Sequence, residues 1–219
     1  MANFHPDIEF LTEYSAGTLP LAQSACVSIH VSKCDHCSLL AAQLADLGAG
    51  LFEALDPQPV GDAQLNAVLA RLDDEAPLAF ERSVERRDSN SIPAILQRLM
   101  RGDFSDLTWK KVGSALRIAH LDTGDPRHEF ALYHIRAGGK IPQHTHRGAE
   151  LTLVLEGGFS DAEGSYHAGD FIYRKPGEVH APTALQSEDC ICIGVLDAPL
   201  KFTDWRFRWM NPFLKLRTS

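Results

Sequence analysis

The sequence has no long apolar run and no leader-like beginning. No stretch approaches the ~20 consecutive apolar residues that a membrane-spanning helix needs. Residues 1–5 also lack the basic flank and apolar core of a secretory signal. We therefore expect a cytoplasmic protein that has no membrane partner.

Cysteine is scarce and odd in number. The 219 residues include five cysteines, and an odd count does not favour a disulfide framework. Two of them, Cys34 and Cys37, are separated by two residues, which is a spacing of metal ligands. With 44% hydrophobic residues, the chain can bury a substantial core, and we expect it to do so in a reducing compartment.

Basic residues are few in the first part of the chain. Residues 1–90 contain 5 basic residues (Lys and Arg) and 14 acidic residues (Asp and Glu). Residues 91–219 contain 16 basic and 15 acidic residues. An acidic region disfavours direct binding of nucleic acid and suits a basic protein partner, because complementary fields speed encounter. A solvated acidic surface without a partner is the alternative interpretation.

The first third of the sequence has helical patterning. Helices are expected over 7–16, from Pro20, over 38–55 and over 65–72, where apolar residues recur at i, i+3, i+4 and i+7. The polar segment 73–91 offers little to a core. These patterns predict a helical domain at 1–80 and a linker at 81–91.

The remainder, 92–219, is predicted to form a β domain after one more helix at 92–100. Short apolar runs such as 130–135 and 190–193 are separated by Gly, Pro and Asp, as in a β-sandwich or barrel. In 151–155, leucines alternate with Thr152 and Val154, so one face should pack on another sheet and the other should line an interior. Alternating aromatic and arginine residues at 205–209 predict a packed terminal strand, with a partner-docking surface as the alternative. The fold class is therefore α+β with two domains.

A first candidate metal site comes from residues near the N-terminus. His30, Cys34 and Cys37 would share one face if the segment were helical, and His5 is the best candidate for a fourth ligand. Two thiolates and two imidazoles suit a closed structural zinc site. His36 would point away from that face. A pair of unrelated buried cysteines is the alternative.

A second candidate site comes from the β region. His144 and His146 lie two apart on a predicted strand and face the same side, Glu150 follows closely, and His180 can join them from a distant strand. Three imidazoles and one carboxylate suit zinc or another divalent metal in a site that stays partly open. A metal-free barrel is the alternative, but burying these four groups without partners would be costly.

Two further cysteines are redox candidates. Cys190 and Cys192 lie two apart on a predicted strand, so both thiols should face one side, where they could lie near the second metal site. Burial as small hydrophobic residues is the alternative interpretation.

Both sets of residues resemble known motifs. His5 with His30, Cys34 and Cys37 resembles the zinc-binding anti-sigma motif. The series Gly138, His144, His146, Glu150 and Gly157 matches the first cupin motif, and Gly169, Pro176, Gly177 and His180 resemble the second. In the second, six residues rather than five separate Gly169 from Pro176, and this could shift a turn but leaves His180 in place. In this order, the motifs resemble the ChrR-type anti-sigma factors.

The resemblance implies a function. It implies that a small helical zinc domain binds an extracytoplasmic-function (group IV) sigma factor, and that a cupin-type β-barrel is needed for release under singlet oxygen or organic hydroperoxide. We therefore expect a transcription regulator and not an enzyme. The alternative is a cupin dioxygenase that uses iron at His144, His146, Glu150 and His180.

Overall fold

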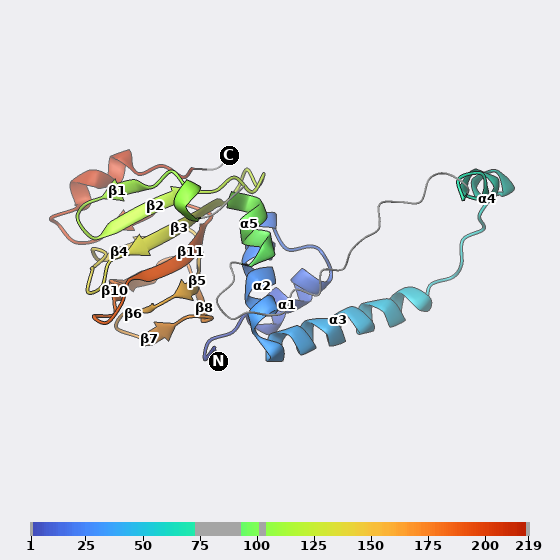
Figure 1. Ribbon diagram of the computed structural model, residues 1–219, viewed down its shortest axis with the longest axis horizontal. Coiled ribbons are helices and arrows are strands. Elements are labelled where there is room, and N and C mark those ends of the chain that lie inside the picture. The colour runs from blue at the N-terminus through green and yellow to red at the C-terminus, as the bar shows by residue number, and fades with distance from the viewer. Residues whose placement is uncertain (1, 73–92, 101–103, 218–219) are drawn as a thin grey trace.

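The computed structural model describes residues 2–72, 93–100 and 104–217. Helices come first and a β-sandwich follows, as Figure 1 shows. The predicted α+β class is confirmed, and among the described residues five α-helices precede the first strand. The predicted linker at 81–91 lies outside the described residues, so the domain limits drawn on either side of it stay predictions.

The first three helices form a compact group. Helix α1 (Ile8–Ser15) begins where the Asp7 side chain accepts a hydrogen bond from the backbone N–H of Phe10. Helix α2 (Leu21–Lys33) ends at Cys34, whose extended backbone turns the chain into α3 (Asp35–Glu53). The expectation that the ligands at 30, 34 and 37 share one helix face is wrong, because the helix is interrupted at Cys34.

Helix α3 extends beyond the body of the protein. All residues of 45–72 are exposed, and they comprise the outer part of α3, a connecting segment and α4 (Asp62–Leu69). We call 45–72 the projecting arm. In Figure 1, α4 lies well away from the other elements. The apolar face predicted at 65–72 exists but is uncovered, since Leu65, Val68 and Leu69 are each about half exposed or more.

The β region contains three antiparallel sheets. The largest has six strands in the order β1-β2-β3-β11-β5-β8, and two three-stranded sheets have the orders β10-β6-β7 and β12-β4-β9. The first four strands are β1 (Lys110–Val112), β2 (Leu116–His120), β3 (Glu129–Ile135) and β4 (His144–His146). The next four are β5 (Glu150–Glu156), β6 (Gly158–Ser160), β7 (Ser165–His167) and β8 (Phe171–Arg174). The last four are β9 (Val179–His180), β10 (Thr183–Ala184), β11 (Cys190–Leu196) and β12 (Leu200–Phe202).

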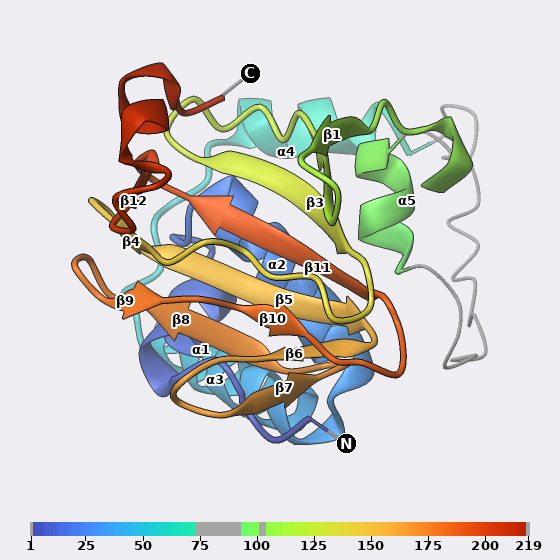
Figure 2. The ribbon, with the colours of Figure 1, turned by 90° about the vertical axis from the view of Figure 1, so that its left-hand side faces the viewer.

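Helices cover one face of the six-stranded sheet. Leu151 and Leu153 of β5 share a buried cluster with Ala25 and Ile29 of α2 and with Leu96 of α5 (Ala94–Met100). On the other face of β5, Val154 shares a buried cluster with Phe159 of β6 and Tyr166 of β7. One face of β5 thus packs on another sheet as expected, whereas the leucine face packs on α2 and does not line an interior. Figure 2 views the sandwich with α1, α2 and α3 behind the strands. Helices and sheet thus share one hydrophobic core.

A β-region loop also holds the start of α2. Pro20 precedes the helix and provides no side-chain cap, but the Asp125 carboxylate lies 3.5 Å from the backbone nitrogen of Ala22 and 3.0 Å from His128 Nδ1. Burial would raise the pKa of Asp125, but the N–H of Arg127 and the neighbouring His128 lower it below its usual range. A buried carboxylate at a helix start complements the helix dipole.

The C-terminal segment differs from its prediction. Two short 3-10 helices occur among the described residues, Phe104–Asp106 and Arg208–Phe213. The predicted strand at 205–209 is wrong, since a turn leads there into the second 3-10 helix, and Trp205 and Trp209 are mostly exposed. Within the part of the chain that the structure describes, no helix is long and apolar enough to cross a membrane.

Candidate metal centres

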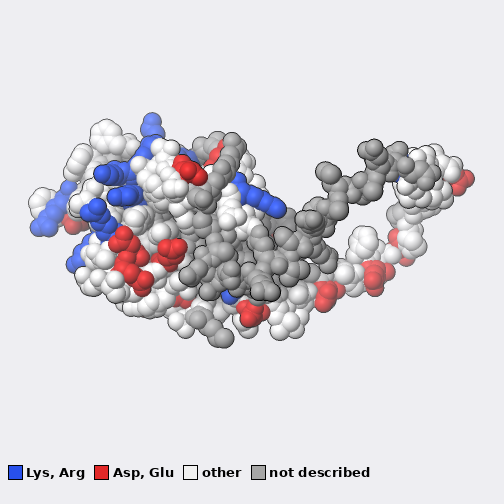
Figure 3. All heavy atoms as spheres, in the orientation of Figure 1, with Lys and Arg blue, Asp and Glu red and all other residues white. Residues whose placement is uncertain are grey.

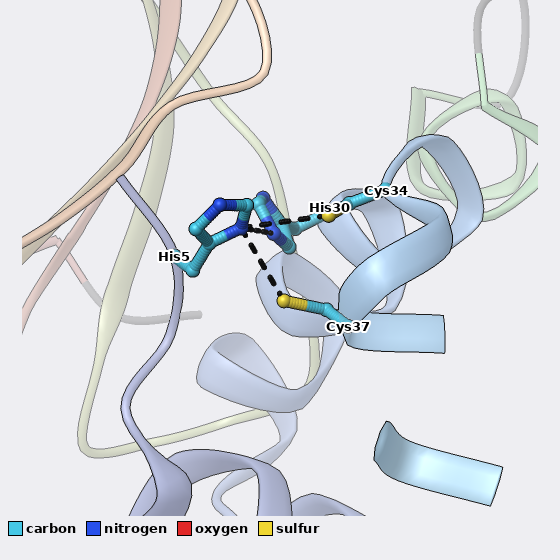
Figure 4. A group of neighbouring side chains, drawn as sticks. All are labelled: His5, His30, Cys34 and Cys37. Carbon is cyan, nitrogen blue, oxygen red and sulfur yellow. Dashed lines mark hydrogen bonds between the residues drawn. The ribbon is translucent and has the colours of Figure 1, made fainter. Parts of the chain in front are cut away.

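The first group of ligands lies at the corner between α2 and α3. His30 is in the last turn of α2, Cys34 is the residue between the helices, and Cys37 is in the first turn of α3. His5 comes from the segment before α1 and completes the group. Figure 4 shows the four side chains pointing toward a common centre.

The distances within this group fit a tetrahedral zinc ion. His5 Nδ1 lies 3.4 Å from His30 Nε2 and 3.4 Å from the Sγ atoms of both Cys34 and Cys37. Tetrahedral zinc with ordinary bond lengths would separate two nitrogens by about 3.3 Å, and a nitrogen from a sulfur by about 3.6 Å. The donor set and its spacing therefore fit zinc, with His5, His30, Cys34 and Cys37 as the residues that would hold it.

Burial keeps the side chains of His30 and Cys37 in this group neutral when no metal is bound. Burial lowers the pKa of His30 to about 4, which leaves the imidazole neutral and able to ligate. Burial, and then the neighbouring Cys34 thiol, raise the pKa of Cys37 to about 12. Without a positive ion, a Cys37 thiolate would be strongly disfavoured, and a metal would supply the missing charge. His36 is exposed, although its ring lies 5.5 Å from that of His5.

The second group of ligands lies inside the β-sandwich. His144 and His146 are on β4, Glu150 begins β5, and His180 ends β9. Strand β4 pairs with β9 so that His144 is directly opposite His180. The alternation of β4 buries both of its histidines and leaves Thr145 between them on the other face.

The imidazole Nε2 atoms of this group converge. His180 Nε2 is 2.9 Å from His144 Nε2 and 3.2 Å from His146 Nε2, and Glu150 Oε2 is 3.1 Å and 3.2 Å from His146 and His180. Ligands at right angles around a divalent metal with bonds near 2.1 Å are separated by about 3.0 Å. The four residues therefore fit a divalent metal with coordination positions left for other ligands.

Neighbouring groups prepare these side chains for a metal. His144 Nδ1 donates to the carbonyl of Pro142 at 2.8 Å, which leaves Nε2 free to ligate. Burial, reinforced by His180, lowers the pKa of His144 to about 4. Burial would raise the pKa of Glu150, but His146 and His180 hold it well below its usual range. The site thus offers a charged carboxylate and a neutral imidazole.

The redox candidates lie elsewhere on the sheet. Cys190 and Cys192 are buried on β11, in a second hydrophobic cluster that also contains Ile135 and Phe159. Glu150 pairs with Leu196, four residues along β11 from Cys192, or about 13 Å of strand. A hydrogen bond from Cys190, and then burial, raise the pKa of the Cys192 thiol well above its usual value. A role in redox chemistry stays a prediction.

Sequence reasoning missed the residues that support the ligands. Asp161, Asp170 and Arg174 are buried charged groups near one or both centres. No local spacing marks them, because their partners are distant in sequence. The carbonyl of Gly169, which lies 2.9 Å from His30 Nδ1, could not be assigned from the sequence either.

Comparisons with known proteins add to this geometry. Residues 97–198 match the family model described as the ChrR cupin-like domain. The anti-sigma-E factor ChrR of Cereibacter sphaeroides is 35% identical over 213 residues, which cover 97% of this chain and 98% of that protein. The chain belongs to the ChrR family. The relative is an anti-sigma factor, so the predictions of a ChrR-type protein and of a regulator that is not an enzyme are confirmed.

A solved structure agrees with this assignment to the ChrR family. The crystal structure of Rhodobacter sphaeroides SigE in complex with the anti-sigma factor ChrR matches with a TM-score of 0.77 and 34% identity. The match covers 90% of this chain and 100% of the solved chain. It therefore extends over the helical and the β parts together, and the predicted combination of a helical region with a cupin-like β region is confirmed.

Proposed function

We propose that this protein is an anti-sigma factor that sequesters an extracytoplasmic-function sigma factor in the cytoplasm and releases it under oxidative stress. The observation that carries the proposal is the match to ChrR, which is 35% identical over 97% of the chain. The helical part with zinc at His5, His30, Cys34 and Cys37 binds the sigma factor. The cupin part, with zinc or another divalent metal, senses the stress.

The projecting arm supports binding to a protein. Apolar side chains on the arm are well exposed, among them Leu47, Leu51, Phe52, Leu55, Val60, Leu65, Val68 and Leu69. Isolated exposed apolar residues need no explanation, but a sustained row of them marks an interaction surface. A sigma factor that packs on this row would bury it and give the arm a partner.

The charge of the arm supports a basic partner surface. Asp46, Glu53, Asp56 and Asp62 lie along the arm, against Arg71 as its one basic residue. Figure 3 shows acidic side chains along this part of the molecule, whereas basic side chains lie together with further acidic ones over the β-sandwich at the other end. Opposite charges on the sigma factor would speed association and align the two proteins.

The first zinc site supports the geometry of the arm. Its ligands come from the end of α2, the start of α3 and the segment before α1. A zinc ion there would fix the angle between α2 and α3, and hence the direction in which α3 carries the arm. Zinc at this corner therefore preorganises the surface that receives the sigma factor.

Charged substitutions on the arm test the binding surface. Leu51→Asp and Leu69→Asp should each weaken sigma binding about 30-fold, because each places a charge in an apolar contact worth about 2 kcal/mol. Phe213→Asp is the matched control, since Phe213 is 76% exposed but lies outside the arm. Isothermal titration of the purified sigma factor into each full-length variant measures the change. Equal affinities for the arm variants and the control would place the binding surface elsewhere.

A further inference from the structure

The N-terminal segment is attached to the β-sandwich. The backbone N–H groups of Asn3 and Phe4 donate to Asp170 Oδ1 at 2.6 Å and 3.1 Å, and the N–H of Phe171 donates to the carbonyl of Phe4 at 3.0 Å. Asp170 is fully buried, and its other oxygen accepts from the N–H of His167 at 2.8 Å. One carboxylate therefore ties residues 3–4 to the turn before β8.

This attachment places two ligands of the first metal site. His5 follows directly after the residues that Asp170 holds. The preceding residue in the same turn, Gly169, has its carbonyl oxygen 2.9 Å from His30 Nδ1, so the Nδ1–H of His30 can donate to it and leave Nε2 facing His5. A hydrogen bond on the far nitrogen fixes the tautomer and the ring orientation of a metal-ligating histidine. Both imidazoles of the site are thus held by the same turn of the β-sandwich.

We propose that the first metal site is shared between the helical and β parts, with Asp170 as the positioning residue for His5, and that its metal affinity is coupled to the second metal site. The cysteine ligands come from the α2–α3 corner alone. The histidine ligands depend on the turn at 169–170, so the site is complete only when the β-sandwich supports it.

A continuous set of contacts leads from this turn to the second site. The ring of Phe4 packs 4.9 Å from the ring of Tyr166, whose hydroxyl accepts a hydrogen bond from Arg174 at 3.0 Å. Arg174 also donates to Asp161 Oδ2 at 2.6 Å, and that oxygen lies 3.5 Å from His180 Nδ1. The side chains of Arg174 and Asp161 are nearly or fully buried.

These contacts give the two sites a physical connection. A metal on His180 Nε2 would fix the ring whose Nδ1 faces Asp161, and Asp161 is held to Tyr166 through Arg174. Buried, packed groups of this kind transmit small displacements because they cannot relax into solvent. Thermodynamic linkage then requires that metal at either site change the affinity of the other by the same factor.

Cobalt provides a probe that reports on the first site alone. Cobalt(II) bound by Cys34 and Cys37 gives a thiolate-to-metal charge-transfer band, whereas the second group has no sulfur ligand. Full-length protein is loaded with cobalt and titrated with a competing chelator while this band is followed. The measurement does not involve a sigma factor, so its outcome is independent of the proposed function.

Asp170→Ala should weaken cobalt binding at the first site about 10- to 100-fold, as is usual when a supporting hydrogen-bond partner of a ligand is lost. Phe4→Ala changes no residue of the β-sandwich and should also weaken cobalt binding at the first site. Asp189→Ala is the matched control, because Asp189 also accepts a backbone N–H, from Ala137, and pairs with His134, both of which lie outside residues 2–5 and the turn at 169–170. Unfolding curves of the metal-free variants identify any general loss of stability.

The coupling is tested by removing the second site. The double variant His144→Ala, His146→Ala should lower the cobalt affinity of the first site about five-fold or more, at the lower end of typical couplings between sites. In a Tyr166→Phe background, which removes the hydroxyl that Arg174 contacts, the same double variant should have little further effect. Wild-type cobalt affinity in Asp170→Ala and Phe4→Ala would overturn the shared site. Unchanged affinity in the double variant would overturn the coupling.

Discussion

Cys37→Ser is expected to remove the zinc of the helical part and to lower affinity for the sigma factor at least about 100-fold. Cys37 is 1% exposed at the start of α3, and zinc binding in small metal-folded domains contributes on the order of 10 kcal/mol to folding. Loss of one thiolate leaves the α2–α3 corner without its cross-link. The arm would then lose its fixed direction even where α2 still packs on the sheet.

Cys26→Ala is the matched control for this substitution. Cys26 is also fully buried, on α2, but it belongs to neither ligand group. Metal content per chain, circular dichroism and sigma affinity are measured for both variants. Retention of two metal equivalents and of wild-type affinity by Cys37→Ser would show that the first site is dispensable.

Substitutions in the second site are expected to abolish induction and to leave inhibition largely intact. His144→Ala removes a ligand inside the β-sandwich, and Glu150→Gln replaces its charged carboxylate by a neutral amide. Both positions lie away from the projecting arm. The arm and all four ligands of its zinc corner remain in these variants, so the sigma factor is still bound at zinc concentrations that saturate the first site. Release needs a group that changes state under stress, and the second metal site is a chemically reactive candidate.

A reporter driven by the sigma factor measures both properties in cells. With the second-site variants, we expect low activity without stress and no rise with singlet oxygen or organic hydroperoxide. His134→Ala is a suitable control, since His134 pairs with the exposed Asp189 and is not a ligand. Normal induction in His144→Ala or Glu150→Gln would remove this site from the sensing step. Turnover of a small diketone or thiol by the iron-loaded protein would instead favour the dioxygenase alternative.

The sequence predicts best what depends on local spacing. The two groups of four ligands that it singles out are brought together by the structure, although zinc itself stays a prediction at both. His30, Cys34 and Cys37 are close in the chain, and His144 and His146 alternate on one strand. His5 and His180 are distant from the other ligands in the chain, and the structure brings them to the two groups.

The sequence predictions fail where tertiary packing determines the structure. The spacing of His30, Cys34 and Cys37 fits one continuous helix, so it could not show that the helix is interrupted at Cys34. The interruption lets Cys37 approach the site from a second helix. Leucines at 151 and 153 have the same alternation whether a sheet or a helix covers them. The buried contacts of Asp170 join residues 166 and 167 positions apart, and no local pattern reveals such a pairing.

The sequence also could not show that the helix of the projecting arm is exposed. The apolar spacing at 65–72 predicts an amphipathic helix, and within the described residues nothing covers its apolar face. An amphipathic pattern reports that a face needs a partner and not whether the partner is in the same chain. The uncovered face therefore supports the proposal that a separate protein, the sigma factor, packs on the arm.

In-vitro transcription with the full-length protein tests the central claim most directly. Core RNA polymerase, the purified sigma factor and a promoter that it recognises are mixed with increasing amounts of the zinc-loaded protein. We predict that the sigma-dependent transcript falls to background near one equivalent of protein per sigma factor. The Leu51→Asp, Leu69→Asp double variant should require far more protein to reach the same inhibition. Undiminished transcript at saturating wild-type protein would contradict the account.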